Sequence, residues 1–188
     1  MKIIKLNNRG FSFVESLVAM AILVYILGAL VVIYSSYSRF YNFLQNKIAM
    51  GSSSRAAMKE LRNDALQADQ IVASHSFSGI QRSTDQHTVV LEIPSIDGSG
   101  NIVDGKYDYA AFYLSGDGLY RTMQADAASS RTSGAVKITD AVQTLTFSYD
   151  NQALDQATKI DADLEMQIVS GGQTVSSRLY QVIYLRNK

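Results

Sequence analysis

A single carboxylate stands at the start of a long apolar stretch of the chain. Glu15 lies between Phe11–Val14 and Ser16–Val18, and residues 16–33 carry no charge. A carboxylate within lipid is costly, so it marks a functional position unless it lies at the membrane surface. Two interpretations are open on this evidence. Glu15 either meets a cationic partner in an assembly, or it is an interfacial residue on an ordinary membrane anchor.

Residues 16–33 are long enough to cross a bilayer. As an α-helix, at about 1.5 Å per residue, they extend roughly 27 Å, which is close to the hydrocarbon thickness. Lys2, Lys5 and Arg9 precede them, so the positive-inside tendency predicts a cytoplasmic N-terminus and export of everything after Tyr34. An ordinary secretory signal needs small residues at a cleavage site after the apolar run. The chain reads YSSYSRFYNF there, which is aromatic and bulky, with Ser35 and Ser36 as a weak candidate.

Residues 5–17 read KLNNRGFSFVESL, which closely resembles the processing site of type IV prepilins. The family pattern is a short basic leader, a Gly, an aromatic residue, Ser or Thr, two apolar residues, Glu and an apolar helix. The resemblance implies that a prepilin peptidase cuts between Gly10 and Phe11 and methylates the new amino group of Phe11. It also implies that Glu15 pairs with the Phe11 amine of a neighbouring subunit, so that two buried charges compensate each other.

Four parts are expected: a leader in residues 1–10, a transmembrane and assembly helix in 11–34, an amphipathic continuation of the helix in 35–73 and a β-rich head in 74–188. The continuation is indicated by apolar residues at helical spacing, namely Tyr37, Tyr41, Leu44 and Ile48, then Met58, Leu61, Ala65, Ala68 and Val72. This stripe keeps its phase through Gly51 and Arg55. Gly51–Ser54 is expected to bend or fray the helix.

The head reads as strands separated by turns. Strands are predicted at residues 88–93, 107–114, 119–124, 142–149, 164–169 and 174–186, with Pro94 ending the first. Turn residues at 115–118 and 170–173 predict hairpins, and residues 126–133 and 150–161 predict loops. The fold class expected is α+β and pilin-like: a long N-terminal helix, membrane-spanning in its first half, packed on an antiparallel β-sheet head.

Composition argues against several functions. The 188 residues include 17 basic and 17 acidic side chains, and removing the three leader cations leaves 14 basic against 17 acidic, a formal charge of −3. A dedicated nucleic-acid-binding domain usually has a basic excess. The absence of cysteine excludes thiol catalysis, iron–sulfur clusters and cysteine zinc sites. His75 and His87 have no nucleophile or metal partner at useful spacing, so a non-enzymatic protein is expected.

Three strings in the head resemble one subgroup of the family. Residues 113–121, 138–142 and 145–150 look like the J-type pseudopilins of type II secretion, the W-type minor pilins and a minor pilin of competence systems. Major pilins generally carry a proline in the second half of the membrane segment, and this chain has none there. The resemblance implies a minor pilin or pseudopilin that primes or joins a type IV pilus or a type II secretion pseudopilus.

The same resemblance implies partners and a location. The partners are the prepilin peptidase, other pilins contacted through the N-terminal helix, and the assembly platform of the inner membrane. The subunit would be a single-pass protein of the cytoplasmic membrane with an extracytoplasmic head, and then part of a cell-surface or periplasmic filament. The alternative function is a binding module at the filament tip, an adhesin or DNA-uptake receptor, which a clustered basic or aromatic surface on the head would favour.

Two further patterns have competing interpretations. Asp97, Ser99, Asn101, Val103, Gly105 and Asp108 fall on the spacing of a calcium-binding EF-hand loop. Ile102 stands where that loop needs Gly, and a hairpin connection explains the same residues. The second pattern is a group of tyrosines that could stack on single-stranded DNA, although packing between strands is favoured; they are Tyr107, Tyr109, Tyr113 and Tyr120.

Overall fold

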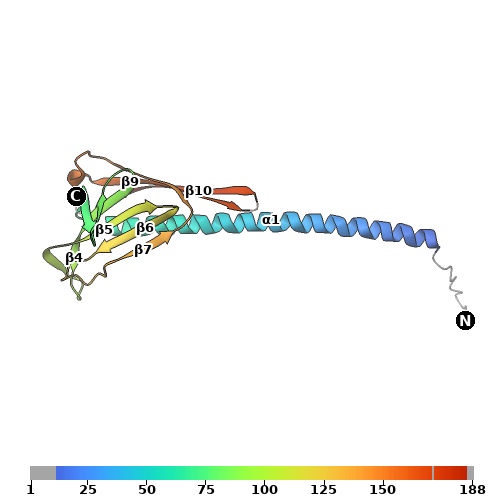
Figure 1. Cartoon of the computed structure of the whole chain (residues 1–188), viewed down its shortest axis with the longest axis horizontal. Coiled ribbons are helices and arrows are strands. Elements are labelled where there is room, and N and C mark those ends of the chain that lie inside the picture. Colours follow the sequence, from blue (N-terminus) through green and yellow to red (C-terminus); the bar gives the residue numbers. More distant parts are fainter. Residues whose placement is uncertain (1–11, 171, 186–188) are drawn as a thin grey trace, which may run out of the picture. The chain divides into compact units, whose positions relative to one another are not determined.

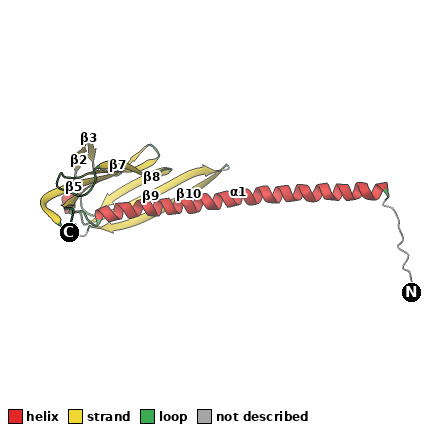
Figure 2. Cartoon of the chain, turned by 90° about the horizontal axis from the view of Figure 1, so that it is seen from below, coloured by secondary structure: helices red, strands yellow, loops and turns green. Residues whose placement is uncertain are grey.

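The structure is a computed structural model that describes residues 12–170 and 172–185. The predicted α+β fold is confirmed, because a long helix, α1 (Phe13–Ala65), packs on antiparallel β-sheet (Figures 1 and 2). The later elements are β1 (Gln70–Ile71), β2 (Ser74–Phe77), β3 (Ile80–Ser83), β4 (Thr88–Ile96), β5 (Ile102–Ser115), β6 (Gly118–Gln124), β7 (Gly134–Thr139), β8 (Val142–Tyr149), the 3-10 turn η1 (Leu154–Gln156), β9 (Lys159–Ser170) and β10 (Gln173–Tyr184).

The helix α1 is continuous over 53 residues. Gly51–Ser54, where a bend or frayed turn was expected, is helical throughout, and the Ser54 hydroxyl donates to the Gly51 carbonyl at 3.2 Å. The chain forms two compact units with their boundary between Leu44 and Gln45, inside α1. The last part of α1 and all the strands therefore belong to one folded head.

The helix ends at Ala65, eight residues before the predicted limit at residue 73. The backbone amides of Asp69 and Val72 donate to the carbonyls of Glu92 and Val90 at 2.8 and 3.0 Å. Pairing with β4 therefore takes over from the helix, even though residues 66–68 are good helix formers. The prediction of a helical stripe through Ala68 and Val72 is wrong for this reason.

Two larger antiparallel sheets and one two-stranded hairpin make the head. The larger has the strand order β1-β4-β5-β6-β7, and the smaller has the order β10-β9-β8. Both predicted hairpins are confirmed, since Ser115 pairs with Gly118 and Ser170 with Gln173. Pro94 does not end the first strand as predicted. The strand β4 continues to Ile96 after an irregularity beyond Pro94, which accommodates the missing amide hydrogen.

The core of the head lies where one face of α1 meets the inner faces of the sheets. The buried residues of α1 recur every three or four positions, namely Met50, Ser54, Ala57, Met58, Leu61, Asp64 and Ala65. Phe112, Leu145 and Leu164 are among the fully buried side chains of the strands. The predicted stripe is correct for Met58, Leu61 and Ala65, whereas Ile48 and Arg55 are exposed.

A separate hairpin, β2-β3, packs on the larger sheet through an apolar cluster of its own. Phe77 of β2 contacts Val90 of β4 and Ala111 and Tyr113 of β5. These positions alternate with Phe112, which belongs to the main core, because successive side chains of a strand point to opposite faces. The larger sheet is therefore covered by the main core on one face and by this hairpin on the other.

Candidate functional site at the start of the helix

Ser12 and Glu15 form a capping box at the first turn of α1. The Ser12 amide donates to Glu15 Oε2 at 2.8 Å, and the Glu15 amide donates to Ser12 Oγ at 3.3 Å. This exchange satisfies two amide groups that have no partner within a helix. Its negative charge also lies at the positive end of the helix dipole. The box involves only residues 12–15, so a cut after Gly10 would leave it intact.

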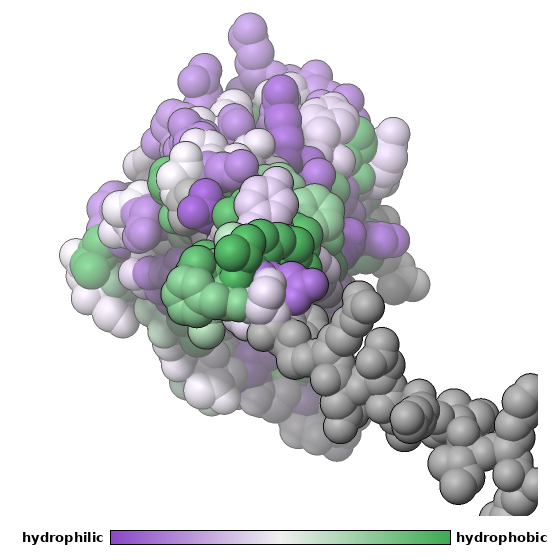
Figure 3. Space-filling view, turned by 90° about the vertical axis from the view of Figure 1, so that its right-hand side faces the viewer, coloured by the Kyte–Doolittle hydropathy of each residue, from purple (hydrophilic) through white to green (hydrophobic). Residues whose placement is uncertain are grey.

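The helix that Glu15 begins presents an apolar surface that the other described residues leave exposed. Large apolar side chains from Phe13 to Ile33 are at least half exposed, with Leu23 at 57% and Val24 at 68%. They include the green group at the front of Figure 3, where the view looks toward the start of α1. Among the described residues, α1 is the one helix long and apolar enough to cross a membrane. It is therefore a candidate membrane span.

The expected processing residues, Gly10 and Phe11, lie outside the described residues. The structure consequently places Glu15 but not the amine with which it is expected to pair. Within residues 12–170 and 172–185, the polar partner of the Glu15 carboxylate is Ser12. Glu15 is exposed to solvent in the structure.

Three of the candidate calcium ligands, Asp97, Ser99 and Asn101, share one turn, but Asp108 is not brought together with them. Asp97 lies in the β4-β5 turn and accepts hydrogen bonds from the amides of Ser99 and Asn101 at 2.8 and 2.9 Å. These bonds lower the pKa of the Asp97 carboxyl. Asp108 lies within β5, opposite Ile93, away from this turn. No group of three or more His, Cys, Asp or Glu within the described residues could hold a metal ion.

Asp108 is instead the centre of a buried ion-pair network. Its side chain is fully buried and accepts hydrogen bonds from Arg131 Nη1 at 2.6 Å, from the hydroxyls of Ser95 and Ser129 at 2.7 Å each, and from the Asp126 amide at 2.8 Å. Burial raises the pKa of Asp108, but these four donors together outweigh burial and hold it below its ordinary value. The network fixes the loop from β6 to β7 against β4.

The two histidines take part in packing and in local hydrogen bonds. The ring of His75 stacks on Tyr109 with centroids 3.7 Å apart. The pKa of His75 is lowered, because the effect of burial outweighs the opposing effects of the Gln124 side chain and the Glu92 carboxylate. His75 Nε2 and Gln124 Oε1 are buried without a well-formed hydrogen bond in the described chain. His87 Nδ1 lies 2.7 Å from the Leu145 carbonyl of β8.

Tyr109, Tyr113 and Tyr120 pack across strands, as the sequence favoured, whereas Tyr107 is 36% exposed. Tyr113 and Tyr120 are partners in the β5-β6 ladder and their rings stack 5.8 Å apart. The guanidinium of Arg82 covers the other face of Tyr113 at 3.6 Å. Lys137 lies 5.7 Å from the Tyr120 ring centre and pairs with Asp140. These two rings therefore lie against each other and beside cationic side chains, and one of these cations is paired with a carboxylate.

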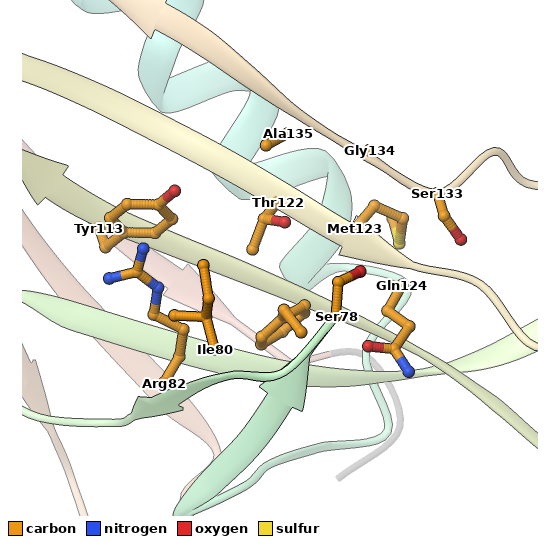
Figure 4. Close-up of a pocket in the computed structure, with 11 residues that line it drawn as sticks. Ser78, Ile80, Arg82, Tyr113, Thr122, Met123, Gln124, Ser133, Gly134 and Ala135 are labelled. Carbon is orange, nitrogen blue, oxygen red and sulfur yellow. The ribbon is translucent and has the colours of Figure 1, made fainter.

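A shallow groove of about 290 Å³ lies beside these rings, between the β2-β3 hairpin and strands β6 and β7. Figure 4 shows Arg82 and Tyr113 at one end, Gln124 and Ser133 at the other, and apolar Ile80 between them. The lining includes no His, Asp, Glu, Lys or Cys. The groove therefore lacks a general base paired with a nucleophile.

Two features of the candidate surfaces were not predicted. The capping box was readable as Ser12 three residues before Glu15. A line of cations at Arg55, Lys59 and Arg62 was readable from its helical spacing, although its position beside β10 was not. Comparison with known proteins finds no family whose model matches the chain and no curated protein with significant similarity.

Proposed function

We propose that the chain is a minor type IV pilin-like subunit, a pseudopilin, whose role is structural rather than enzymatic. In this proposal a prepilin peptidase cuts after Gly10 and methylates Phe11. The membrane-anchored helix then joins other pilins through the inner-membrane assembly platform. The subunit primes, or enters, a type IV pilus or a type II secretion pseudopilus with its head outside the cytoplasm.

The observation that carries the proposal is the combination of features along α1. Its first part is an exposed apolar helix with one carboxylate in the first turn, and its last part packs on a β-sheet head. An isolated membrane anchor needs neither a carboxylate beside its apolar span nor a helix that continues into the head. A helix that leaves the bilayer to pack among other subunits uses both, because Glu15 can compensate the Phe11 amine of a neighbour.

Replacing Glu15 separates this role from that of the capping box. Glutamine can still accept the Ser12 amide hydrogen, so Glu15→Gln keeps the cap but removes the charge, whereas Glu15→Ala removes both. The measurement is the amount of subunit in filaments sheared from its native host, with the amount in the membrane fraction as the control. We expect both variants to reach the membrane and to be lost from filaments. Incorporation of Glu15→Gln at the level of the wild type would refute the assembly role.

A further inference from the structure

The strand β10 is a long edge that lacks the usual protection. It pairs with β9 along its full length, from Gln173 to Tyr184, and no other described strand pairs with it. Its 12 residues contain no Pro, Gly or Lys, and its one charged side chain, Arg178, is paired with Asp163. Tyr180 and Tyr184 are 60% and 65% exposed. An unpaired edge of this kind can accept a further strand.

A basic groove lies between this edge and α1. It has a volume of about 500 Å³ and is lined by Leu179, Tyr180 and Gln181 of β10 and by a basic stripe, Arg55, Lys59 and Arg62, of α1. The stripe follows the spacing i, i+4, i+7, so its three side chains share one side of the helix. All three are exposed. A strand added to β10 would run alongside them.

The charges of the basic stripe are uncompensated. Across residues 12–170 and 172–185, none of its three side chains forms a salt bridge, whereas Arg121, Arg131, Arg178 and Lys159 each pair with a carboxylate. A strand that carries carboxylates on the side facing α1 would supply the missing charge. Charge complementarity therefore selects an acidic occupant.

A second copy of this chain does not fit the same edge. Pairing of two β10 edges around a two-fold axis would place both helices on the same face of the joined sheet. The two basic stripes would then face each other across the junction, and like charges brought together oppose association. The occupant is thus a different chain.

We propose that the β10 edge and the basic stripe together bind an extended acidic segment of a partner protein, which joins the smaller sheet as a fourth strand. Backbone hydrogen bonds to β10 would supply affinity, and carboxylates facing Arg55, Lys59 and Arg62 would supply specificity. This proposal is independent of the role of Glu15. The competing interpretation is that the basic stripe only protects the edge from unwanted pairing.

The test uses the full chain in an uncharged detergent and three labelled ten-residue peptides. In the first peptide, Glu and Val alternate, and in the second, Lys replaces each Glu. The third has the sequence of the first, but every second backbone amide is N-methylated, so that it cannot pair fully as a strand. We expect saturable binding of the Glu peptide that is weakened by salt. The other two peptides should bind at least about tenfold more weakly than the Glu peptide. Equal binding of all three peptides, or binding of none, would overturn the proposal.

Charge reversal locates the binding. The triple variant Arg55→Glu, Lys59→Glu, Arg62→Glu should lose about tenfold in affinity for the Glu peptide and prefer the Lys peptide. The matched control is Lys106→Glu, which reverses an exposed cation on β5 of the other sheet and should leave the affinities unchanged. The stripe would only protect the edge if the triple variant still preferred the Glu peptide to the Lys peptide. The same conclusion would follow if the triple variant associated with itself and bound no peptide.

Discussion

At the scale of single residues, the most demanding chemistry in the head is the burial of Asp108. An ionised carboxylate removed from water is stable only when donors replace the lost solvent. Arg131, two serine hydroxyls and a backbone amide do so here. Removal of the carboxylate leaves the Arg131 guanidinium, with 16% of its side chain exposed, without its counter-charge.

We therefore predict that Asp108→Ala lowers the free energy of unfolding by about 3–5 kcal/mol, the range for breaking a buried pair. Urea denaturation of the full chain in detergent measures this loss. Asp97→Asn is the matched control, because Asp97 is only partly buried and asparagine can form the same turn. It should change stability by no more than about 0.5 kcal/mol. Equal effects of the two substitutions would contradict the account of the network.

The lowered pKa of Asp108 predicts a dependence on pH. Its folded-state pKa lies below the ordinary value of 3.8, so its contribution to stability is present above that value and is lost as the pH falls through the folded-state pKa. The difference in free energy of unfolding between the wild type and Asp108→Asn should thus be constant above about pH 5 and shrink at lower pH. A difference that stays constant down to about pH 2 would mean that the carboxyl is not stabilised in its charged form.

These residue-scale features differ in how far the sequence reveals them. Ser12 and Glu15 are neighbours in the chain, so the spacing of three is enough to predict the capping box. Asp108 and Arg131 are 23 residues apart in the sequence, and the paired residues Asp64 and Arg121 are 57 residues apart. Pairs of this kind depend on strand register, which no local pattern in this chain determines.

At the scale of elements, α1 has two surfaces with different roles. Leu61 is 3% exposed and packs in the head, whereas Ile48, earlier on the same helix, is 64% exposed. We predict that Leu61→Ala destabilises the head by about 2–5 kcal/mol through lost burial and a residual cavity. Ile48→Ala should cost no more than about 0.5 kcal/mol in the same urea experiment. A similar loss from both would mean that the packed face of α1 is wrongly assigned.

The strands show which elements a sequence can reveal. The strand β8 was predicted with its bounds, because Val142, Leu145 and Phe147 stand apart from polar neighbours. The strands β2 and β3 were missed because SHSF and IQRS have too few β-branched or apolar residues. Also missed were β1, which has two residues, and β7, an edge strand after a Ser-rich loop. Tertiary pairing, rather than local propensity, forms these four strands.

At the scale of the whole molecule, charge and hydropathy are separated along the sequence. Lys2, Lys5 and Arg9 precede the apolar span, and the residues after Gly10 are formally −3. In the proposed function, this order would keep the N-terminus in the cytoplasm and place the residues beyond the span outside it. A subunit that keeps its anchor after processing can be held in the membrane and then withdrawn into a filament. An ordinary secretory signal would be removed together with the apolar span.

The most direct test of the central claim is the intact mass of the protein purified from its native host, with the sequence of its N-terminus. We expect a chain that begins at Phe11 and carries one additional methyl group. A chain that still begins at Met1, or one cut near Ser36, would contradict it. Glu15 would then be an interfacial carboxylate on an ordinary anchor, or part of a discarded signal.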